Sequence, residues 1–233
     1  MPGLGLDARS WSRVWPYLDG PSTAVTLPTM GRAASTLDDL RPEALAVRLV
    51  EQLPPSGPLV LVGHSASCQV VGEARRDDRV VGVVLVGPTT ARWIASWPAI
   101  VGRWSLTAVH EHLWEIPLVG PQYLRTGLWT MARGMDRIRH HRLDRALAVG
   151  GVPMAVVRGG HDRIADAAWC RHLAATCVDG SVTTVPGAGH MVPLTHPAAV
   201  ATVVEEMRRR VAVTVRGFDG GDPGQRRKRG AHP

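Results

Sequence analysis

The sequence predicts an α/β fold with a mostly parallel sheet and helices on both of its faces. Continuous apolar runs rich in valine and leucine occur at residues 59–62, 79–86 and 152–159, and a more polar strand pattern follows at 181–186. Segments with the apolar spacing of helices lie between these runs. Strands that alternate with helices are typical of a parallel sheet, and runs that are apolar throughout indicate strands buried on both faces.

The elements are expected in the following order. Residues 1–7 form a loop, and residues 10–18 form a short helix capped by Ser10. Residues 23–27 form a short strand, and a helix that opens on a proline covers residues 42–52. The first apolar run then forms the strand that leads into the central turn of the chain.

The second half of the chain repeats the alternation after a long interruption. A helix is expected at 166–176, between the last two strands, and Pro197 opens the final helix. Residues 89–151 show helical patterns and no convincing strand. Most of the five tryptophans in this insert are expected in its core, with one or two lining a pocket: Trp93, Trp97, Trp104, Trp114 and Trp129.

These patterns divide the chain into three parts. Residues 1–88 and 152–215 form the α/β core, and residues 89–151 form a helical insert. Residues 216–233 are rich in glycine and proline, and we expect them to be a disordered basic tail.

Composition narrows the class of protein. The chain has 233 residues, of which 45% are hydrophobic and 20% charged, the balance of a soluble globular protein. The tail, with five basic residues against two aspartates, supplies three of the seven net positive charges, so no specific nucleic-acid binding is expected. No membrane span and no signal peptide are predicted. Three cysteines without metal spacing indicate reduced thiols, and hence the cytoplasm.

A sharp strand–turn–helix unit is predicted at Gly63-His64-Ser65-Ala66-Ser67. Such a turn needs small flanking residues, and Gly63 and Ser67 are small, although a second glycine is usual. The turn lifts the hydroxyl of Ser65 above the sheet. It also directs the backbone N–H of Ala66 to the start of a helix, where the dipole favours a developing oxyanion. The alternative is an ordinary turn with an incidental serine.

Two later loops offer the base and the acid that a serine nucleophile needs. Asp162 follows the third strand, with Asp166 just inside the next helix as a rival, and His190 lies in a glycine-rich loop after the fourth strand. The order Ser65, Asp162, His190, with each residue at the carboxyl end of a strand, predicts a catalytic triad. Asp162 is preferred over Asp166, although capping the next helix is its alternative role.

The chain resembles the α/β-hydrolase superfamily, of the esterase-like kind that carries a lid. The resemblance covers residues 2 to about 213. It is carried by the turn at 63–67, by Arg158-Gly159-Gly160-His161-Asp162, by Gly187-Ala188-Gly189-His190 with Pro197 beyond, and by Pro2-Gly3-Leu4-Gly5 with Ser10-Trp11. The last pair of segments resembles the oxyanion loop and the helix after it. The resemblance implies that residues 89–151 form the lid and that the N–H of Leu4 is a second oxyanion donor.

Roles follow for the three side chains. Ser65 attacks a carbonyl carbon, His190 takes its proton and later passes it to the leaving group, and Asp162 orients the imidazole. The expected activity is cleavage of a carboxylic ester or thioester of a small apolar molecule through an acyl-enzyme. Hydrolysis of a carbon–carbon bond uses the same triad and stays open, as does cofactor-free perhydrolysis. A catalytically silent binding protein on this fold is the alternative from another class.

No cofactor and no metal site are predicted. His110 and His112 flank Glu111, but two histidines at that spacing do not share a helix face. His64, next to the serine, is expected to have a packing role. His140 and His141 are expected at the surface.

The sequence departs from the family at its start. Family members carry two or three strands before the oxyanion loop, which begins here at Pro2 where a histidine is frequent. One of those strands would lie between the strands at 23–27 and 59–62, and each buried amide left without a partner costs about 1–3 kcal/mol. We therefore expect a sheet that lacks its first strands and a chain that starts internally.

Overall fold

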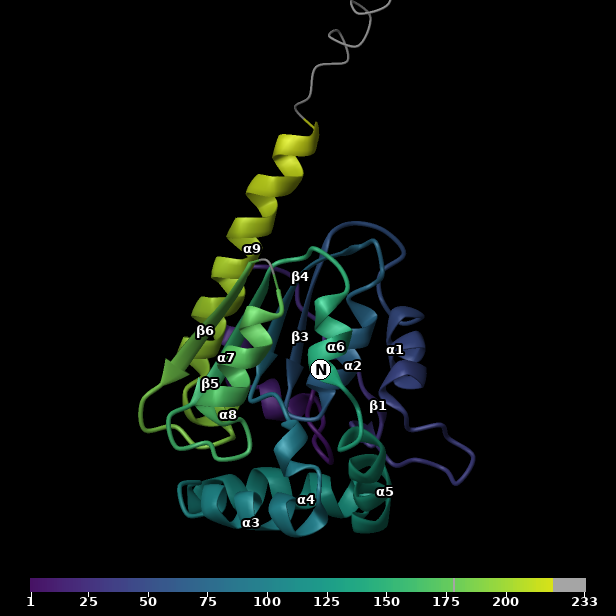
Figure 1. Cartoon of the computed structure of the whole chain (residues 1–233), viewed down its shortest axis with the longest axis vertical. Helices are drawn as coiled ribbons and strands as arrows, with labels where there is room; N and C mark the ends of the chain where they lie inside the picture. The colour runs from purple at the N-terminus through teal and green to yellow at the C-terminus, as the bar shows by residue number, and fades with distance from the viewer. Residues whose placement is uncertain (178, 220–233) are drawn as a thin grey trace, which may run out of the picture.

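A parallel sheet forms the centre of the molecule. The computed structural model describes residues 1–177 and 179–219. Within them, the strands β3 (Leu59–His64), β4 (Val80–Val86), β5 (Met154–Gly159) and β6 (Gly180–Val185) pair in the order β3-β4-β5-β6, and all the pairs are parallel. The order follows the sequence because each strand is joined to the next by a helical crossover (Figure 1).

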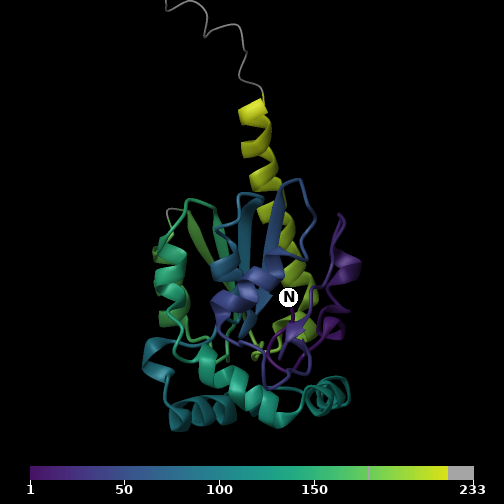
Figure 2. The ribbon, with the colours of Figure 1, turned by 90° about the vertical axis from the view of Figure 1, so that its right-hand side faces the viewer.

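Helices cover both faces of this sheet, as the sequence predicts. One face packs against α1 (Pro42–Val50), α2 (Ser67–Ala74), α6 (Leu143–Ala148) and α7 (Ala167–Ala175). The opposite face packs against α9 (Pro197–Asp219) and the N-terminal segment. Figure 2 shows the sheet between green helices on one side and yellow α9 with the purple N-terminal segment on the other.

The two cores result from the alternation of side chains along each buried strand. On β4, Val83 and Leu85 point into the cluster with α1, α2 and α7, while Val84 and Val86 point into the cluster with α9. All four are fully buried. This explains why the strand is apolar at almost every position.

The insert between β4 and β5 is helical throughout its described elements. It contains η3 (Arg92–Ile94), α3 (Trp97–Ala108), η4 (Leu113–Glu115), α4 (Ile116–Thr126), α5 (Leu128–Ile138) and α6. Helices α3, α4 and α5 lie together across the end of the sheet to which the strands point (Figure 1). Helix α6 instead joins the core layer, because Leu143 and Leu147 pack on Gly72 of α2, where a Cβ would lie 2.5 Å from Leu143.

The N-terminal elements differ from the predicted ones. In place of one helix at 10–18 there are two 3₁₀ turns, η1 (Ala8–Trp11) and η2 (Trp15–Tyr17), and the cap is Asp7, which accepts the N–H of Arg9 at 2.9 Å. Pro16 has no N–H to continue a helix. In place of a strand at 23–27 only β1 (Leu27–Pro28) forms, and it pairs with β2 (Gly31–Arg32).

Strand β3 ends the sheet, and its outer edge is only partly paired. The Met1 amino group donates to the carbonyl of Val62 at 2.5 Å, and the N–H of His64 donates to the carbonyl of Met1 at 3.2 Å. Beside this edge lies a cavity of about 790 Å³, lined by Leu59, Leu61 and other apolar side chains. In the described part of the chain, Met1 is the residue that hydrogen-bonds to this edge, and the absence of the first strands stays a prediction.

The final helix is longer than expected. Helix α9 continues to Asp219, into the segment predicted as a tail, and residues 220–233 lie outside the described part of the chain. No helix in the described ranges combines the length and the apolar character needed to cross a membrane.

Candidate active site

Ser65 lies at the apex of a sharp turn between β3 and α2. Its φ of 56° is in the left-handed region, which side chains other than glycine rarely adopt. A Cβ on Gly63 would lie 3.1 Å from the carbonyl oxygen of Ser67, so this position has little room for a side chain. Ser67 replaces the usual glycine. Its Oγ accepts the N–H of His64 at 2.8 Å, and this hydrogen bond stabilises the turn.

The histidine loop and the acid loop meet next to this turn. Nε2 of His190 lies 2.8 Å from Oγ of Ser65, and Nδ1 of His190 lies 2.7 Å from Oδ2 of Asp162. The two loops are joined by backbone bonds, since the N–H of Gly160 donates to Val185 at 2.8 Å and that of His161 to Ala188 at 2.9 Å. The structure therefore brings the three predicted side chains into one hydrogen-bonded chain.

Asp162, rather than Asp166, reaches the imidazole. Its Oδ1 accepts the N–H groups of Ile164 and Ala165 at 2.8 and 3.0 Å, which fixes the carboxylate and leaves Oδ2 for His190. Asp166 instead caps α7 by accepting the N–H of Trp169 at 2.8 Å. The capping role considered for the acid thus belongs to the rival residue.

The electrostatics favour a charged acid and a basic imidazole. Burial raises the pKa of Asp162, but the charge of His190 and the hydrogen bonds from His190, Ala165 and Ile164 lower it by more, so it lies below its ordinary value. Burial likewise lowers the pKa of His190, yet the charge and hydrogen bond of Asp162, together with the charge of Glu111, place it above the ordinary value. The pair is therefore arranged to hold a proton on the imidazole.

Of the two expected oxyanion donors, Ala66 lies in this turn and Leu4 in a loop that packs against it. Ala66 precedes the first residue of α2, and neither its N–H nor that of Leu4 donates a hydrogen bond within the described chain. The loop of Leu4 lies against the turn, because a Cβ on Gly3 would come within 3.2 Å of Cβ of Ser65. Both N–H groups are thus available beside the serine.

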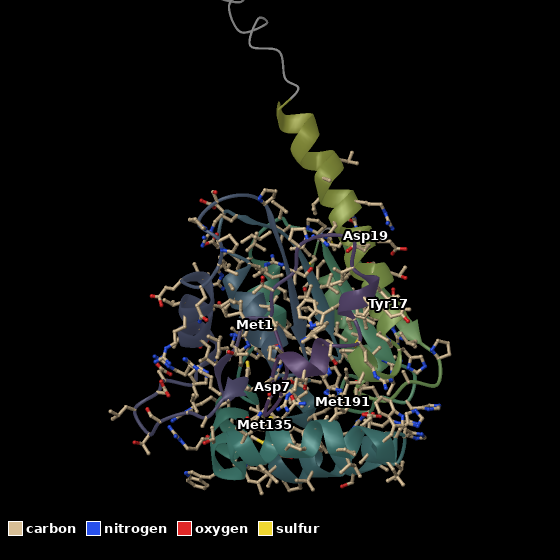
Figure 3. All side chains as sticks on the ribbon, turned by 180° about the vertical axis from the view of Figure 1, so that it is seen from behind. Met1, Asp7, Tyr17, Asp19, Met135 and Met191 are labelled. Atoms are coloured by element: carbon tan, nitrogen blue, oxygen red, sulfur yellow. The ribbon has the colours of Figure 1, made fainter. Side chains whose placement is uncertain are left out.

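Helix α4 hydrogen-bonds to the loop that contains Leu4. Oε1 of Gln122 accepts the N–H of Asp7 at 2.7 Å, and Oγ1 of Thr126 donates to the carbonyl of Gly5 at 3.2 Å. Gly5 has a φ of 77°, and a Cβ there would lie 2.6 Å from Tyr123. Figure 3 shows the labelled Asp7, Met135 and Met191 where the core meets the teal helices of the insert.

His64 has the packing role that was expected, together with one hydrogen bond. Its Nε2 lies 3.1 Å from the carbonyl oxygen of His190, and Trp11 packs edge-on against its ring. Burial and the neighbouring His190 lower its pKa to about 3, so the ring stays neutral. A neutral ring with a proton on Nε2 donates to the loop of His190 and stabilises it.

The prediction that most of the insert's tryptophans are core residues is wrong. All five have at least 39% of their surface exposed, and Trp129 has 76%. The buried side of α4 carries Gln122 and Thr126 instead. The guanidinium of Arg13 stacks on the ring of Trp114, with its central carbon 4.2 Å from the ring centre.

His141 was expected at the surface, but it is half-buried and its side chain is only 4% exposed. Its Nε2 lies 2.9 Å from Oε1 of Glu73. Together with the nearby Glu43, these residues have ligand atoms close enough to one another to hold a metal ion. Arg76 also forms an ion pair with Glu73 at 3.0 Å, so Glu73 already has two partners, His141 and Arg76. Burial raises the pKa of Cys68, and this cysteine takes no part in the site.

A parallel sheet that presents a serine at a sharp turn to a histidine–aspartate pair is the arrangement of an α/β-hydrolase. The model of the alpha/beta hydrolase family matches residues 1–203. The chain belongs to this family of enzymes.

Solved structures with the same fold are distant in sequence. A hydrolase from Oleispira antarctica is 14% identical, with 88% of each chain covered and a TM-score of 0.71. A bromoperoxidase from Bacillus anthracis is 13% identical, with 88% of each chain covered and a TM-score of 0.68. A thermophilic esterase from Thermogutta terrifontis is 20% identical, covering 90% of this chain and 92% of its own, with a TM-score of 0.62. No curated protein matches the chain.

Proposed function

We propose that the protein is a serine hydrolase that cleaves a carboxylic ester or thioester through a triad of Ser65, His190 and Asp162. The observation that carries the proposal is the pair of hydrogen bonds of 2.8 and 2.7 Å that links the hydroxyl to the imidazole and the imidazole to the carboxylate. Nucleophile and base are within the distance over which a proton passes.

In the proposed reaction, Oγ of Ser65 attacks the carbonyl carbon while Nε2 of His190 takes the hydroxyl proton. The carbonyl oxygen becomes an oxyanion, which the N–H groups of Ala66 and Leu4 stabilise. The imidazolium then gives its proton to the leaving alcohol or thiol, and an acyl-enzyme remains. Water, deprotonated by His190, hydrolyses this ester and restores the free serine.

The substrate class is proposed as small and apolar. Side chains of Tyr123 and Met131 lie against Gly5, and Leu4 packs with the buried core cluster that contains Met135. These contacts place apolar groups against one part of the proposed oxyanion loop, beside the polar contacts of Gln122 and Thr126. We also propose the cytoplasm as its location, because all three cysteines are free thiols.

Two other functions use the same observations. Carbon–carbon bond hydrolysis requires the same triad, and the bromoperoxidase of the same fold keeps perhydrolysis open. A silent binding protein would not need the serine and histidine to be hydrogen-bonded. The triad geometry therefore favours an enzyme.

A fluorophosphonate probe tests the proposal. We expect it to label the wild-type protein and the Ser56→Ala variant, which loses an exposed serine, but not Ser65→Ala or His190→Ala. A folded wild-type protein that takes no label would contradict the proposal. A panel of nitrophenyl esters of increasing chain length then identifies the preferred acyl group, and a short-chain preference supports a small substrate.

A further inference from the structure

The end of helix α3 and the turn after it contact the loop of Asp162. The N–H of Arg163 donates to Oγ1 of Thr107 at 3.1 Å, and Arg103 donates to the carbonyl of Arg163 at 3.2 Å. The ring of His110 packs on that of His161 with 4.3 Å between their centres. This part of the insert is therefore attached to the acid loop by both polar and ring contacts.

Glu111, the residue after His110, contacts the loop of His190. Its Oε1 accepts the backbone N–H groups of His190 and of Met191, the latter at 3.2 Å. Two successive N–H groups that converge on one carboxylate oxygen form charge-assisted hydrogen bonds, which are stronger than neutral ones. The backbone of the proposed base is thus held by a residue of the insert, 79 positions earlier in the chain.

The loop has room for this carboxylate because residue 189 is a glycine. A Cβ on Gly189 would lie 2.6 Å from Oε1 of Glu111, and the two other atoms closest to it also belong to Glu111. The φ of Gly189 lies outside the left-handed region, so backbone conformation does not require glycine there. The space beside position 189 is therefore occupied by the Glu111 side chain.

Several ionisable groups face Glu111. Glu115 of η4 is buried, and burial together with the charge of Glu111 raises its pKa to about 7, although the N–H of His112 acts in the opposite direction. Tyr123 of α4 also lies close, and burial with these two carboxyl groups raises its pKa to about 12.

We propose that Glu111 is a positioning residue for the reaction proposed above: its carboxylate fixes the backbone of His190, and its charge stabilises the imidazolium that forms when Ser65 loses its proton. This inference rests on the proposed function. It assigns the insert a part in catalysis, because the turn after α3 supplies the group that aligns the base.

Two substitutions separate the two effects of Glu111. Glu111→Ala removes both the acceptor and the charge, and we expect kcat and the rate of fluorophosphonate labelling to fall about 10- to 100-fold, since small misplacements of a catalytic group have effects of this size. KM is expected to change little. Glu111→Gln keeps an acceptor oxygen, so most of the rate returns, but the acid limb of the pH profile moves to lower pH because the charge is gone.

A control and a coupled variant complete the test. Glu51→Gln removes an exposed carboxylate of the same type and is expected to match the wild type in rate and pH profile. Gly189→Ala lowers the rate in the wild-type background, because its methyl group displaces Glu111. It adds little in the Glu111→Ala background, where the three closest atoms are absent.

The outcomes distinguish this inference from the proposed function. If the wild type labels at Ser65 and Glu111→Ala labels equally fast with an unchanged pH midpoint, the inference is overturned and the proposed function stands. If the wild type does not label, both are overturned. If Glu111→Ala does not fold by circular dichroism, Glu111→Gln decides, and an unshifted acid limb in that variant overturns the inference.

Discussion

Oδ2 of Asp162 lies 2.7 Å from Nδ1 of His190, with both side chains buried where two loops meet. The other carboxylate oxygen accepts two N–H groups of its own loop, from Ile164 and Ala165. The carboxylate therefore has one oxygen for the loop and one for the imidazole.

Replacing the acid tests its role in orienting the imidazole. Asp162→Asn keeps the shape of the side chain, but its amide can hold the imidazole in the wrong tautomer, so we expect kcat to fall by about 10³- to 10⁴-fold. Steady-state hydrolysis of a nitrophenyl ester measures this. Asp166→Asn is the matched control, because Asp166 caps α7, and its kcat is expected to stay within a few-fold of wild type. Equal losses in both variants would contradict the assignment.

The pH dependence of activity follows from the environment of His190. Burial lowers its pKa, but Asp162 and Glu111 raise it by more, so the pKa lies above the ordinary 6.5. The imidazole must be neutral to accept the proton of Ser65, and kcat/KM therefore falls as the pH drops through this pKa. We expect a midpoint above 6.5 in the acid limb of the profile. A midpoint clearly below that value would disagree with the site.

The pH dependence of stability reports on Glu115. Its pKa is raised from 4.5 to about 7 in the folded protein, so the folded state binds more protons than the unfolded state between these values. The contribution of Glu115 to the free energy of unfolding therefore becomes less favourable as the pH rises through this window. Glu115→Gln stays neutral and removes this slope.

Urea unfolding at pH 5 and pH 8 measures the effect. We expect the free energy of unfolding of Glu115→Gln, measured relative to wild type, to be higher at pH 8 than at pH 5. The exposed Glu51→Gln is expected to show no such difference between the two pH values. The same difference between wild type and Glu115→Gln at both pH values would show that Glu115 does not titrate in this window.

The oxyanion loop is tested through Gly5. Gly5→Ala places a methyl group where it meets Tyr123 and Met131, at a φ of 77° that already disfavours a side chain. We expect the N–H of Leu4 to move away from the oxyanion, and the loss of one such donor lowers kcat about 10²- to 10³-fold.

A second glycine serves as the control for backbone strain. Gly57 also has a positive φ, of 92°, but a Cβ there meets nothing within 4 Å and lies outside the site. Gly57→Ala is expected to lower the melting temperature slightly and to leave kcat unchanged. A similar fall in kcat for both variants would mean that strain, rather than the oxyanion loop, explains the loss.

The strands and the triad were predictable because their signals are local. Runs such as residues 80–86 are apolar on both faces, which only a strand inside a parallel sheet explains, and loops that follow such strands must meet at one edge. That rule brings the loops that contain Ser65, Asp162 and His190 to the same edge of the sheet. The structure puts them within hydrogen-bond distance, while their roles remain proposals.

The insert and the N-terminus were not predictable in the same way. Tryptophans in a helical insert were expected to form its core, but polar Gln122 occupies the buried side of α4 because it bonds the backbone at Asp7. That partner is 115 residues away and leaves no local pattern. Glu111 was overlooked for the same reason, although an acidic residue between two histidines was a visible signal.

The most direct measurement of the central claim is the site of the acyl group during turnover. We would quench the wild-type protein with acid while it hydrolyses a nitrophenyl ester and map its peptides by mass spectrometry. A triad with Ser65 as nucleophile predicts one acyl group on the peptide that contains Ser65, and none in Ser65→Ala. Turnover that persists in Ser65→Ala, or an acyl group on another residue, would contradict it.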